Sequence, residues 1–547
     1  MTPITGLLGR SAHVDTFCRD HLPPPESWPE YLFELPELQY PERLNCAVEL
    51  LDATIARFGA DRRCLLSPDG EQWSYGQVRD TVDRIANVLT TECDIVPGNR
   101  VLLRGPNNPW LAACWLAVLK AGAVAVTTMP LLRAAELTTI AGIAKINLSL
   151  CDHRFTTELA AADMGEAQII VYGGEAPDDL TSRVAAATDT FRAVDTAADD
   201  VALLAFTSGT TGRPKATMHF HRDVIAICDT FSRHHVRPRP DDIATGTPPL
   251  GFTFGLGGLL VFPLRAGAAS LLLEKATPDE LADAIERHQA TICSTAPTAY
   301  RAMLRAGRAA SLRSLRRAIS AGEHLPEPTW RDFHEETGIR LIDGIGSTEM
   351  LHVFVSAADD DIRPGATGKA VPGYRATILD ERGQPVPPGT PGRLAVKGPT
   401  GCRYLDDPRQ ADYVQNGWNI TGDTFAQDRD GYFYYQARTD DMIISAGYNI
   451  AGPEVEEALG AHPAVQECCV VGAPDPERGQ IVQAFVVLQK DFAGDDALTI
   501  ELQEFVKARI APYKYPRSVQ FVDTLPRTMT GKLQRHVLRQ QTAAETV

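Results

Sequence analysis

The sequence lacks the features of a disulfide-bonded, metal-cluster or membrane-spanning protein. Its eleven cysteines are scattered, with Cys468 and Cys469 as the only close pair and no C-x-x-C spacing, so neither a zinc site nor a disulfide framework is expected. A membrane helix needs about 20 uninterrupted apolar residues. The most apolar stretch, residues 110–131, is broken by Lys120 and predicts a buried helix followed by a strand. The first residues contain no basic segment followed by an apolar one, so we expect no signal peptide and a cytoplasmic protein with reduced thiols.

The sequence also contains fewer basic than acidic residues. The 547 residues include 53 Lys and Arg against 70 Asp and Glu, which gives a formal net charge of −17. This balance argues against a protein that holds nucleic acid through broad phosphate contacts, and neither a nucleic-acid nor a membrane partner is expected. Any anionic ligand must therefore bind at a local site. With 44% hydrophobic and 22% charged residues, the composition is that of a globular protein, and the length corresponds to about three to four domains.

Alternating helical and strand-like patterns from residue 45 onward predict an α/β fold. The clearest segments are strands at residues 201–206, 270–273 and 291–294, and helices at residues 278–288 and from Pro297 onward. Proline suits a first helical turn because the N–H that it lacks has no partner there. The first forty residues are rich in proline and predict an extended arm on the surface.

The pattern changes near residue 375 and again after residue 438. Residues 375–379 and 393–397 alternate around a Gly- and Pro-rich turn, which predicts a hairpin in a small β-rich subdomain. The later segments predict a compact α+β domain, with helices at 453–460 and 500–510 and strands at 465–471 and 482–488. We therefore expect an N-terminal domain at residues 1–439 and a C-terminal domain at residues 440–547.

A segment rich in glycine and hydroxyl side chains follows the apolar strand at 201–206 and precedes a predicted helix. It consists of Thr207, Ser208, Gly209, Thr210, Thr211, Gly212, Arg213, Pro214 and Lys215. Glycines permit close approach and positive φ, hydroxyls donate, and a lysine adds charge, so this loop can wrap the oxygens of a polyphosphate. The Walker pattern G-x-x-x-x-G-K-[ST] is absent. The alternative is a polar surface turn.

A second candidate follows the strand-like residues 339–342. It consists of Asp343, Gly344, Ile345, Gly346, Ser347, Thr348 and Glu349. The glycines permit close approach of a flat ligand, Thr348 can donate to a phosphate, and Glu349 can hold magnesium, which prefers oxygen ligands. The G-x-G-x-x-G pattern is not completed, so a dinucleotide-binding fold is not supported.

Two further candidates lie near the predicted domain boundary and near the C-terminus. Asp423 and Arg438 offer a carboxylate and a guanidinium that can grip the two hydroxyls of a ribose; alternatively, they form an ordinary surface ion pair. Lys532 follows Gly531. The alternative for Lys532 is a mobile lysine in a tail.

The order and local sequence of these four segments resemble the acyl-adenylate-forming superfamily, which includes acyl- and aryl-CoA ligases, adenylation domains and beetle luciferases. The resemblance extends from about residue 46 to residue 532. Residues 343–354 (DGIGSTEMLHVF) and 402–407 (CRYLDD) resemble the benzoate-CoA ligase group. Residues 13–17 (HVDTF), 22–25 (LPPP) and 251–258 (GFTFGLGG) are most similar to 2-aminobenzoate-CoA ligases. The resemblance implies a large N-terminal body, a small C-terminal domain that rotates, and a nucleotide held between them.

The resemblance also implies roles for the candidate residues, with ATP, magnesium and coenzyme A as cofactors or co-substrates. The Gly- and Thr-rich segment with Lys215 would hold the β- and γ-phosphates, Thr348 would contact the α-phosphate, and Glu349 would carry magnesium. Asp423 and Arg438 would hold the ribose. Adenine would lie against Gly322, Glu323, His324, Asp343, Gly344 and Ile345. Lys532 would reach the α-phosphate and the acyl carboxylate, Asp440 would be the hinge, and Gly447 would border the pantetheine tunnel.

The acyl pocket implied by the resemblance consists of Phe252, Thr253, Phe254, Gly346, His352 and Val353. Two Phe rings and a small glycine suit a flat ring of the size of benzoate. Residues 249–255 lack the Asp with which relatives bind an α-ammonium group, which argues against α-amino acids. Thr253 or His352 could accept a hydrogen bond from an ortho amino group. Alternatively, His352 is an ordinary core histidine and the Phe rings only pack the core.

Three functions remain open at this stage. The leading one is an ATP-dependent aryl-CoA ligase for a small aromatic acid, with 2-aminobenzoate favoured and benzoate as its nearest competitor. The second is a stand-alone adenylating enzyme that loads a carrier protein instead of free CoA. The third is a nucleotide-binding regulator without turnover, which the presence of Lys215, Glu349 and Lys532 makes the weakest of the three.

Overall fold

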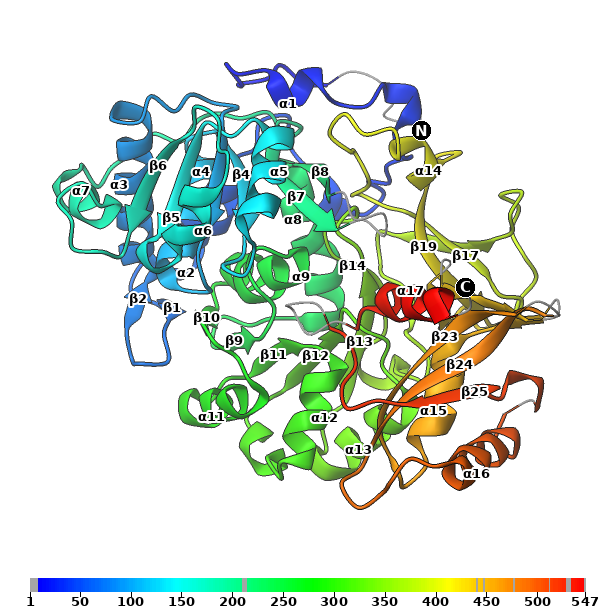
Figure 1. The fold of residues 1–547 in the computed structure, drawn as a ribbon. Coiled ribbons are helices and arrows are strands. Elements are labelled where there is room, and N and C mark those ends of the chain that lie inside the picture. Colours follow the sequence, from blue (N-terminus) through cyan, green and yellow to red (C-terminus); the bar gives the residue numbers. More distant parts are fainter. Residues whose placement is uncertain are drawn as a thin grey trace. The chain divides into compact units, whose positions relative to one another are not determined.

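Parallel strands joined by helices build the larger part of the chain (Figure 1). The structure, a computed structural model, describes residues 8–208, 214–438, 441–445, 448–475, 478–510, 512–527 and 533–545. The chain divides into two units, one of Met1–Ala376 with Val396–Asn419 and the other of Thr377–Ala395 with Ile420–Val547. The α/β fold class, with a large N-terminal body and a small C-terminal domain, is confirmed. A boundary at residue 440 stays a prediction, because residues 439–440 lie outside the described residues.

One sheet of the first unit has six strands in the order β6-β5-β3-β4-β7-β8. Its strands are β3 (Arg100–Arg104), β4 (Val124–Thr128), β5 (Leu148–Asp152), β6 (Gln168–Tyr172), β7 (Val201–Ser208) and β8 (Pro214–Phe220). All pairs are parallel except β7 with β8, which are antiparallel. The helices in this part of the chain are α3 (Tyr75–Thr91), α4 (Pro109–Lys120), α5 (Ala134–Ala144), α6 (Thr156–Ala161) and α7 (Leu180–Ala186). The predicted buried helix and strand within residues 110–131 are confirmed as α4 and β4.

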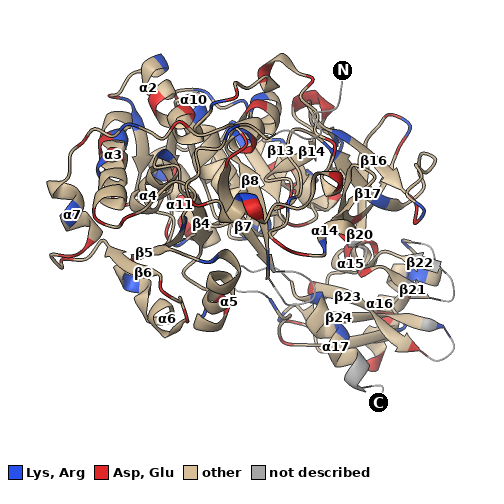
Figure 2. Cartoon of the chain, turned by 90° about the horizontal axis from the view of Figure 1, so that it is seen from above, with Lys and Arg blue, Asp and Glu red and all other residues tan. Residues whose placement is uncertain are grey.

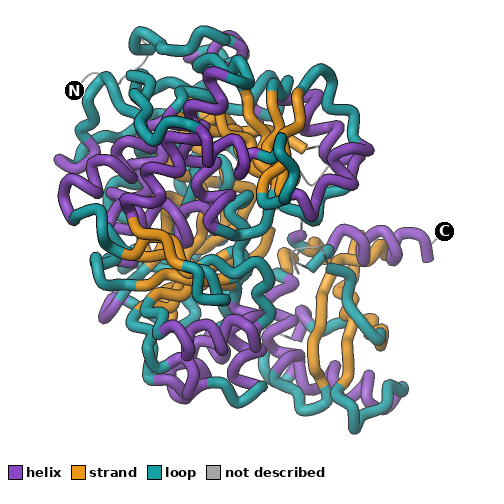
Figure 3. Tube along the Cα trace, turned by 90° about the vertical axis from the view of Figure 1, so that its left-hand side faces the viewer, coloured by secondary structure: helices purple, strands orange, loops and turns teal. Residues whose placement is uncertain are grey.

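The second sheet of this unit has nine strands in the order β15-β14-β13-β12-β11-β9-β10-β1-β2. They are β1 (Arg63–Leu66), β2 (Gln72–Ser74), β9 (Ile243–Gly246), β10 (Ala269–Leu271), β11 (Ile292–Thr295), β12 (Arg317–Ala321), β13 (Leu341–Gly346), β14 (Val353–Ser356) and β15 (Lys369–Ala370). The helices nearby in sequence are α2 (Ala53–Phe58), α8 (His221–Ile227), η5 (Cys228–Val236), α9 (Thr253–Leu256), η6 (Gly257–Val261), α10 (Phe262–Ala266), α11 (Pro278–His288), α12 (Pro297–Arg305) and α13 (Glu327–Thr337). In Figure 3 the helices of this unit lie over its strands.

The residues after 375 form two smaller sheets. The first has the order β16-β17-β19-β18, with β20 paired to β19, and the second has the order β22-β21-β24-β23, with β25 paired to β24. Their elements are β16 (Arg375–Leu379), β17 (Gly392–Lys397), α14 (Gln410–Tyr413), β18 (Val414–Gln415), β19 (Trp418–Gln427), β20 (Phe433–Arg438), β21 (Ile443–Ser445), β22 (Tyr448–Ile450), α15 (Gly452–Gly460), β23 (Val465–Asp475), β24 (Gly479–Leu488), α16 (Asp496–Lys507), β25 (Ser518–Phe521) and α17 (Arg535–Glu545). Basic and acidic residues are interspersed along the elements of both units (Figure 2).

The local structure departs from the predictions at two places. The predicted helix after the Gly- and Thr-rich loop is present as α8, which begins at His221, but the strand β8 that precedes it was not predicted; Lys215 and its neighbours pair there with β7 in an antiparallel hairpin. The N-terminal arm is not simply extended on the surface. It contains α1 (Phe17–Asp20), and Cys18 is buried in the core formed by residues such as Leu102 and Val124, since an apolar side chain gains free energy by leaving water.

Candidate active site

The turn between β13 and β14 carries the candidate phosphate and metal residues. Gly346 pairs with Val353 across this antiparallel hairpin, so Ser347, Thr348 and Glu349 lie in the connection that begins at the carboxyl end of β13. The amide of Met350 donates to Ser347 Oγ at 3.2 Å, which closes a tight local turn. In such sheets, ligands bind beyond the carboxyl ends of the parallel strands.

The imidazole of His219 fixes this turn from β8. Its Nε2 donates to the carbonyl oxygen of Thr348 at 2.8 Å, and its side chain is fully buried. Lys215 lies on the same strand four residues earlier, and positions two or four apart on a strand share a face. One face of β8 therefore presents both Lys215 and the histidine that positions Thr348.

Lys215 and Glu349 form an ion pair within the first unit. Lys215 Nζ lies 3.3 Å from Glu349 Oε1, and the Glu349 residue is only 7% exposed. Because the pair is poorly solvated, its attraction is stronger than that of an exposed pair. The arrangement brings together a cation suited to phosphate oxygens and a carboxylate suited to a hard metal ion.

The candidate adenine residues lie at neighbouring strand ends. β12 and β13 are parallel, with Ser320 opposite Asp343 and Ala321 opposite Gly344. Gly322, which directly follows β12, has φ +87°, a conformation that glycine adopts without strain; it is followed by Glu323 and His324. Burial raises the pKa of the Asp343 carboxyl to about 7.

The candidate acyl residues Phe254 and His352 line one apolar pocket of the first unit. Its remaining lining comes from several helices and strands: Phe231, Val236, Pro238, Ala244, Gly258, Phe262, Pro263, Ile292, Ser294 and Ile319. Phe252 and Thr253 precede Phe254 at the start of α9, with Phe252 in the N-cap position. Val353 opens β14 and is buried.

His352 lies among three phenylalanine rings. The ring centroids of Phe262, Phe231 and Phe254 are 4.6, 5.5 and 5.8 Å from that of His352. Burial lowers the pKa of His352 to about 3, so the imidazole is neutral at physiological pH. Among the described residues, neither ring nitrogen forms a hydrogen bond of standard geometry, although an interaction with the backbone of Phe254 partly opposes the lowering of the pKa. A neutral imidazole offers one donor and one acceptor, so a ligand group that donates can pair with the acceptor nitrogen inside the aromatic pocket.

The ribose candidates belong to the second unit. Asp423 on β19 and Arg438 on β20 are directly opposite each other in the antiparallel pairing. The Asp423 amide donates to Thr421 Oγ1 at 3.3 Å, and Asp423 is buried. The pairing therefore places the backbones of the two ribose candidates opposite each other on one sheet.

Several predicted residues lie outside the described residues: Gly209, Thr210, Thr211, Gly212, Lys532, Asp440 and Gly447. The loop from Gly209 joins two described ends, since Ser208 pairs with Pro214 and Thr207 with Lys215. The roles assigned to all of these residues stay predictions.

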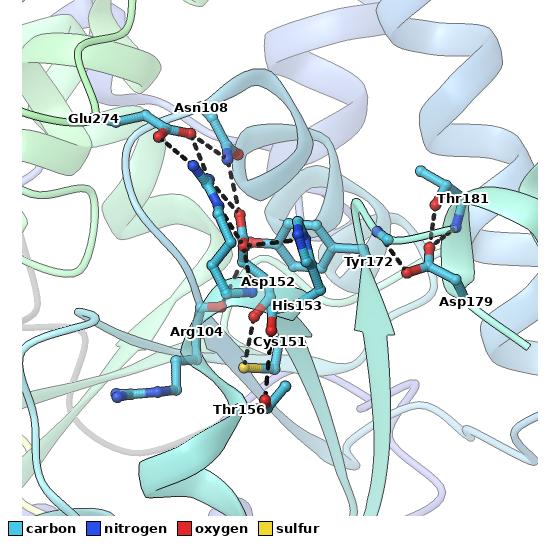
Figure 4. Close-up of polar contacts among 12 residues, drawn as sticks. Arg104, Asn108, Cys151, Asp152, His153, Thr156, Tyr172, Asp179, Thr181 and Glu274 are labelled. Atoms are coloured by element: carbon cyan, nitrogen blue, oxygen red, sulfur yellow. Dashed lines mark hydrogen bonds and ion pairs between the residues drawn. The ribbon is translucent and has the colours of Figure 1, made fainter. Parts of the chain in front are cut away.

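A separate cluster of charged side chains lies at the carboxyl end of β5 (Figure 4). Arg154 donates two hydrogen bonds to Asp152, at 2.9 and 2.8 Å, and two to Glu274, both at 2.7 Å. Asn108, the N-cap residue of α4, donates to both carboxylates. Since these groups are paired with one another, the cluster joins the segment after β5 to the segment after β10 and we interpret it as a structural brace.

Sequence reasoning missed Tyr404, His219, Phe231 and Phe262. The hydroxyl of Tyr404 donates to Glu349 Oε1 at 2.5 Å, although the two residues are far apart in sequence. His219 had a usable signal, because it lies on the same strand face as Lys215, but strand β8 was not predicted. The two phenylalanines come from η5 and α10, and only the packing of these helices brings them to His352.

The described parts of the chain contain neither a cluster of metal-ligating side chains nor a membrane-spanning helix. No group of three or more His, Cys, Asp and Glu side chains that could hold a metal ion is found there. None of the helices described is long and apolar enough to cross a membrane.

Two family models match the chain. The model for AMP-binding enzymes matches residues 51–403, and the model for the C-terminal domain of AMP-binding enzymes matches residues 454–532. The first match alone covers more than half of the chain. The chain therefore belongs to the AMP-binding enzyme family.

Known relatives match over nearly their whole length. The benzoate–CoA ligase of Thauera aromatica is 34% identical over 515 residues, which are 92% of this chain and 97% of that protein. The 3-hydroxybenzoate–CoA ligase of Aromatoleum sp. (strain CIB) is 34% identical over 513 residues, with 91% and 97% covered. Within the family, these similarities group the chain with the benzoate–CoA ligases, and the chain is an AMP-forming acid–thiol ligase.

Solved structures agree in fold. The anthranilate CoA ligase AuaEII in complex with anthranoyl-AMP has a TM-score of 0.88 and 31% identity, with 94% of this chain and 100% of that chain covered. A benzoate CoA ligase from Burkholderia xenovorans LB400 has a TM-score of 0.83 and 32% identity, with 91% and 100% covered.

Proposed function

We propose that this chain is an ATP-dependent aryl-CoA ligase whose favoured acid is 2-aminobenzoate. The enzyme adenylates the aromatic carboxylate with release of pyrophosphate and then transfers the acyl group to CoA with release of AMP. The observation that carries the choice of acid is His352, a neutral imidazole that forms no hydrogen bond of standard geometry with the described residues and lies in a pocket of aromatic rings.

The pocket chemistry supports an aromatic acid with a polar substituent. Phe231, Phe254 and Phe262 suit a flat ring, while a buried polar group without a partner costs free energy until a ligand pairs with it. The ortho amino group of 2-aminobenzoate can donate to the acceptor nitrogen of His352. Plain benzoate has no such donor and leaves His352 unpaired, and a site built to form a hydrogen bond discriminates against a ligand that lacks the partner.

The similar proteins support two acids. The matching structure with an anthranoyl-AMP ligand supports 2-aminobenzoate, since anthranilate is the same compound. The benzoate–CoA ligase relative at 34% identity supports benzoate as the second candidate. Transfer to free CoA rather than to a carrier protein is favoured by the CoA ligases among the relatives.

In the first half-reaction, a carboxylate oxygen of the acid attacks the α-phosphorus of ATP. The bond from this phosphorus to the bridging oxygen breaks, and pyrophosphate leaves with the electron pair. The attacking carboxylate and the phosphates are all negatively charged, so catalysis depends mainly on positioning these groups and on supplying cations. We assign Lys215, with the loop from Thr207 to Gly212, to the β- and γ-phosphates, and Thr348 to the α-phosphate.

The residues present fit a magnesium ion held jointly with the nucleotide. Magnesium at such sites takes one or two carboxylates, with its other ligands from phosphates and water. Glu349 supplies one buried carboxylate beside the ammonium group of Lys215. When bound, the ion would neutralise phosphate charge, and the task of Glu349 is to hold it against the nucleotide.

The second half-reaction replaces AMP by the thiolate sulfur of CoA at the acyl carbon. Both half-reactions act on the same acyl phosphate, which favours a domain that swings between two positions. We assign Lys532 to the first position, Asp440 to the hinge and Gly447 to the passage for the pantetheine arm. Asp423 and Arg438 hold the ribose throughout.

The proposal is tested with a panel of acids, namely 2-aminobenzoate, benzoate, 2-hydroxybenzoate, 3-hydroxybenzoate and a linear fatty acid. Formation of AMP and of acyl-CoA is followed with each acid at saturating ATP and CoA. We expect the highest kcat/KM for 2-aminobenzoate, by about tenfold or more over benzoate, because the hydrogen bond contributes about 1–3 kcal/mol. A higher value for benzoate rejects the choice of acid, and adenylation only of the fatty acid rejects an aryl ligase.

A further inference from the structure

Tyr404 lies between the cation and the carboxylate of the candidate nucleotide site. Its hydroxyl donates to Glu349 Oε1 at 2.5 Å and accepts a hydrogen bond from Lys215 Nζ. Lys215 Nζ is also 3.3 Å from the same carboxylate oxygen. Among the described residues, both contacts of the carboxylate fall on Oε1, so Oε2 is the oxygen that can face a cation.

The ring of Tyr404 is held as firmly as its hydroxyl. Tyr404 is only 1% exposed, and its ring packs edge-on against Tyr413 with a centroid distance of 5.9 Å. Lys215 Nζ lies 4.4 Å from the centroid of the Tyr404 ring, a distance typical of a cation–π contact. The hydroxyl of Tyr413 in turn lies 3.0 Å from Ser347 Oγ, so the two tyrosines together contact both ends of the Ser347–Glu349 segment.

The backbone on either side of Tyr404 is fastened to the strand that carries Lys215. The Met218 amide donates to the Arg403 carbonyl at 2.8 Å, and the Leu405 amide donates to the Ala216 carbonyl at 2.9 Å. These bonds extend the sheet beyond β8 and place Tyr404 opposite Thr217. Tyr404 and Lys215 therefore belong to one hydrogen-bonded framework.

Arg403, the residue before Tyr404, is held in place on the opposite face of this framework. It is fully buried and pairs with Asp223, and it also donates to the Tyr31 hydroxyl at 2.6 Å. Its guanidinium lies 3.8 Å from the ring centroid of Phe220. Successive residues of a strand point to opposite faces, so a rigidly held Arg403 fixes the direction in which Tyr404 projects.

We propose that Tyr404 is a positioning residue for the triphosphate of MgATP, an inference that rests on the nucleotide site of the proposed function. Opposite charges 3.3 Å apart attract each other strongly where water is excluded, and a direct pair of Lys215 with Glu349 competes with phosphate and metal for both groups. The Tyr404 hydroxyl occupies Oε1 of Glu349 and offers Lys215 a neutral partner. It thereby keeps Oε2 oriented for the metal and leaves Lys215 free to turn to the phosphates.

The test is Tyr404→Phe, which removes the hydroxyl and keeps the ring. The affinities of the purified protein for MgATP and for AMP are measured by calorimetry without any acid. We expect MgATP to bind about tenfold more weakly, because a hydrogen bond to a charged group is lost. AMP has neither β- nor γ-phosphate, and its affinity should stay within twofold of wild type. A merely structural role would weaken both ligands together, which overturns the proposal, as does an unchanged affinity for MgATP.

Tyr300→Phe is the matched control. Tyr300 is also fully buried, and its hydroxyl lies 3.0 Å from the Cys293 carbonyl and 3.1 Å from the Ile319 carbonyl. This variant loses a buried hydroxyl away from Lys215 and Glu349, and we expect a lower melting temperature with an unchanged affinity for MgATP. The binding measurements contain no acid, so they do not depend on which acid the enzyme uses. Failure of every aromatic acid in the panel would reject the substrate assignment, and the effect of Tyr404→Phe on MgATP affinity could still be interpreted.

Discussion

At the scale of single residues, His352 lowers the stability of the folded protein and offers a hydrogen-bonding group to the proposed substrate. Its imidazole is buried without a hydrogen bond of standard geometry to the described residues, which lowers stability, and burial lowers its pKa to about 3. An unfolded chain binds a proton to this histidine near the ordinary value of about 6.5, whereas the folded chain does not. Proton uptake by the unfolded chain at His352 therefore leaves the free energy of unfolding unchanged above about pH 6.5 and lowers it as the pH falls below that value.

We predict that His352→Leu separates stability from specificity. The free energy of unfolding should equal or exceed that of wild type at pH 7, because a buried unpaired group is removed. The advantage of the variant should grow by about 2 kcal/mol between pH 7 and pH 5, since only the wild type loses stability through this histidine. The measurements are urea unfolding at both pH values and kcat/KM for two acids.

The specificity part of the prediction concerns the ratio of kcat/KM for 2-aminobenzoate to that for benzoate. We expect this ratio to fall about tenfold in His352→Leu, since the bond to the amino group is worth about 1–3 kcal/mol. A ratio that stays at the wild-type value would show that His352 is an ordinary core histidine.

The resemblance to the benzoate-CoA ligase group implied Phe254 and His352 as pocket candidates, and the structure has both of them in the lining of one pocket. The partners of His352 were not predictable in the same way. Phe231 and Phe262 belong to helices that carry many apolar residues, and no local pattern marks which of their side chains reach one particular ring. Contacts of this kind depend on how helices pack on a sheet.

At the scale of elements, local signals predicted helices better than strand pairing. α11 spans Pro278–His288 as predicted, because Thr277 and Glu280 form a capping box and proline occupies the first turn. Strand β8 was not predicted, because its strand state comes from pairing with β7, a contact that short-range propensity does not contain.

The helical glycine Gly257 gives a test at this scale. It begins η6, and a Cβ added there would overlap the ring of His352 and lie 3.1 Å from Phe262 Cζ. The His352 ring is enclosed by phenylalanines, so it cannot move away easily. We predict that Gly257→Ala lowers the free energy of unfolding by about 1–3 kcal/mol and lowers kcat/KM for the aromatic acid about tenfold, with little effect on the affinity for MgATP.

Gly142→Ala provides the comparison. Gly142 lies within α5, is exposed, and a Cβ added there meets no atom within 4 Å. We expect this substitution to raise the free energy of unfolding by about 0.5–1 kcal/mol without a change in kcat/KM. Equal effects of the two substitutions would mean that helix propensity, rather than the position of His352, decides the outcome.

At the scale of the molecule, the body depends on links between its two large sheets. The brace of Asp152, Arg154 and Glu274 is one of these links, since β5 belongs to one sheet and Glu274 follows β10 of the other. Burial alone would raise the pKa of Asp152, but hydrogen bonds from the side chain and backbone of Arg154 hold it below the ordinary value. The stability contributed by this carboxylate is therefore present above about pH 4 and is lost as the pH falls further.

We predict that Asp152→Asn lowers the free energy of unfolding by about 1–3 kcal/mol at pH 7, because a charged hydrogen-bond acceptor is lost. Arg154 is 43% exposed, so screening by water favours the lower end of this range. The difference from wild type should shrink as the pH falls below about 4, because the unfolded wild-type chain takes up a proton at Asp152 before the folded protein does. Denaturant unfolding at pH 7 and at pH 3 measures both effects.

Asp360→Asn is the control for this prediction. Asp360 pairs with Arg340, but its side chain is 97% exposed, and exposed pairs contribute about 0–1 kcal/mol. We expect a smaller loss at pH 7 than for Asp152→Asn. A loss as large as that of Asp152→Asn would argue that net charge, and not the brace, sets the stability.

The division into a large α/β body and a small C-terminal domain was predictable because composition and pattern change along the chain, whereas the boundary near residue 438 stays a prediction. Charged links such as Arg154 with Glu274 were not predictable, since they join residues that are 120 positions apart. Nor did the sequence show that Arg403 and Tyr404 extend the sheet beyond β8, although their segment was recognised as typical of the benzoate-CoA ligase group.

The short turn from Ser347 to His352 has a consequence for how enzymes of this kind diverge. It carries the candidate metal ligand Glu349 near its middle and the candidate substrate contact His352 at its end, and β13 and β14 fix both of its ends. An insertion or deletion there would displace both groups together, so a descendant could not change its preferred acid by altering loop length without harming nucleotide chemistry. New preferences should instead arise by point substitution on the facing wall, along α9 and η6, which is also where directed evolution should begin.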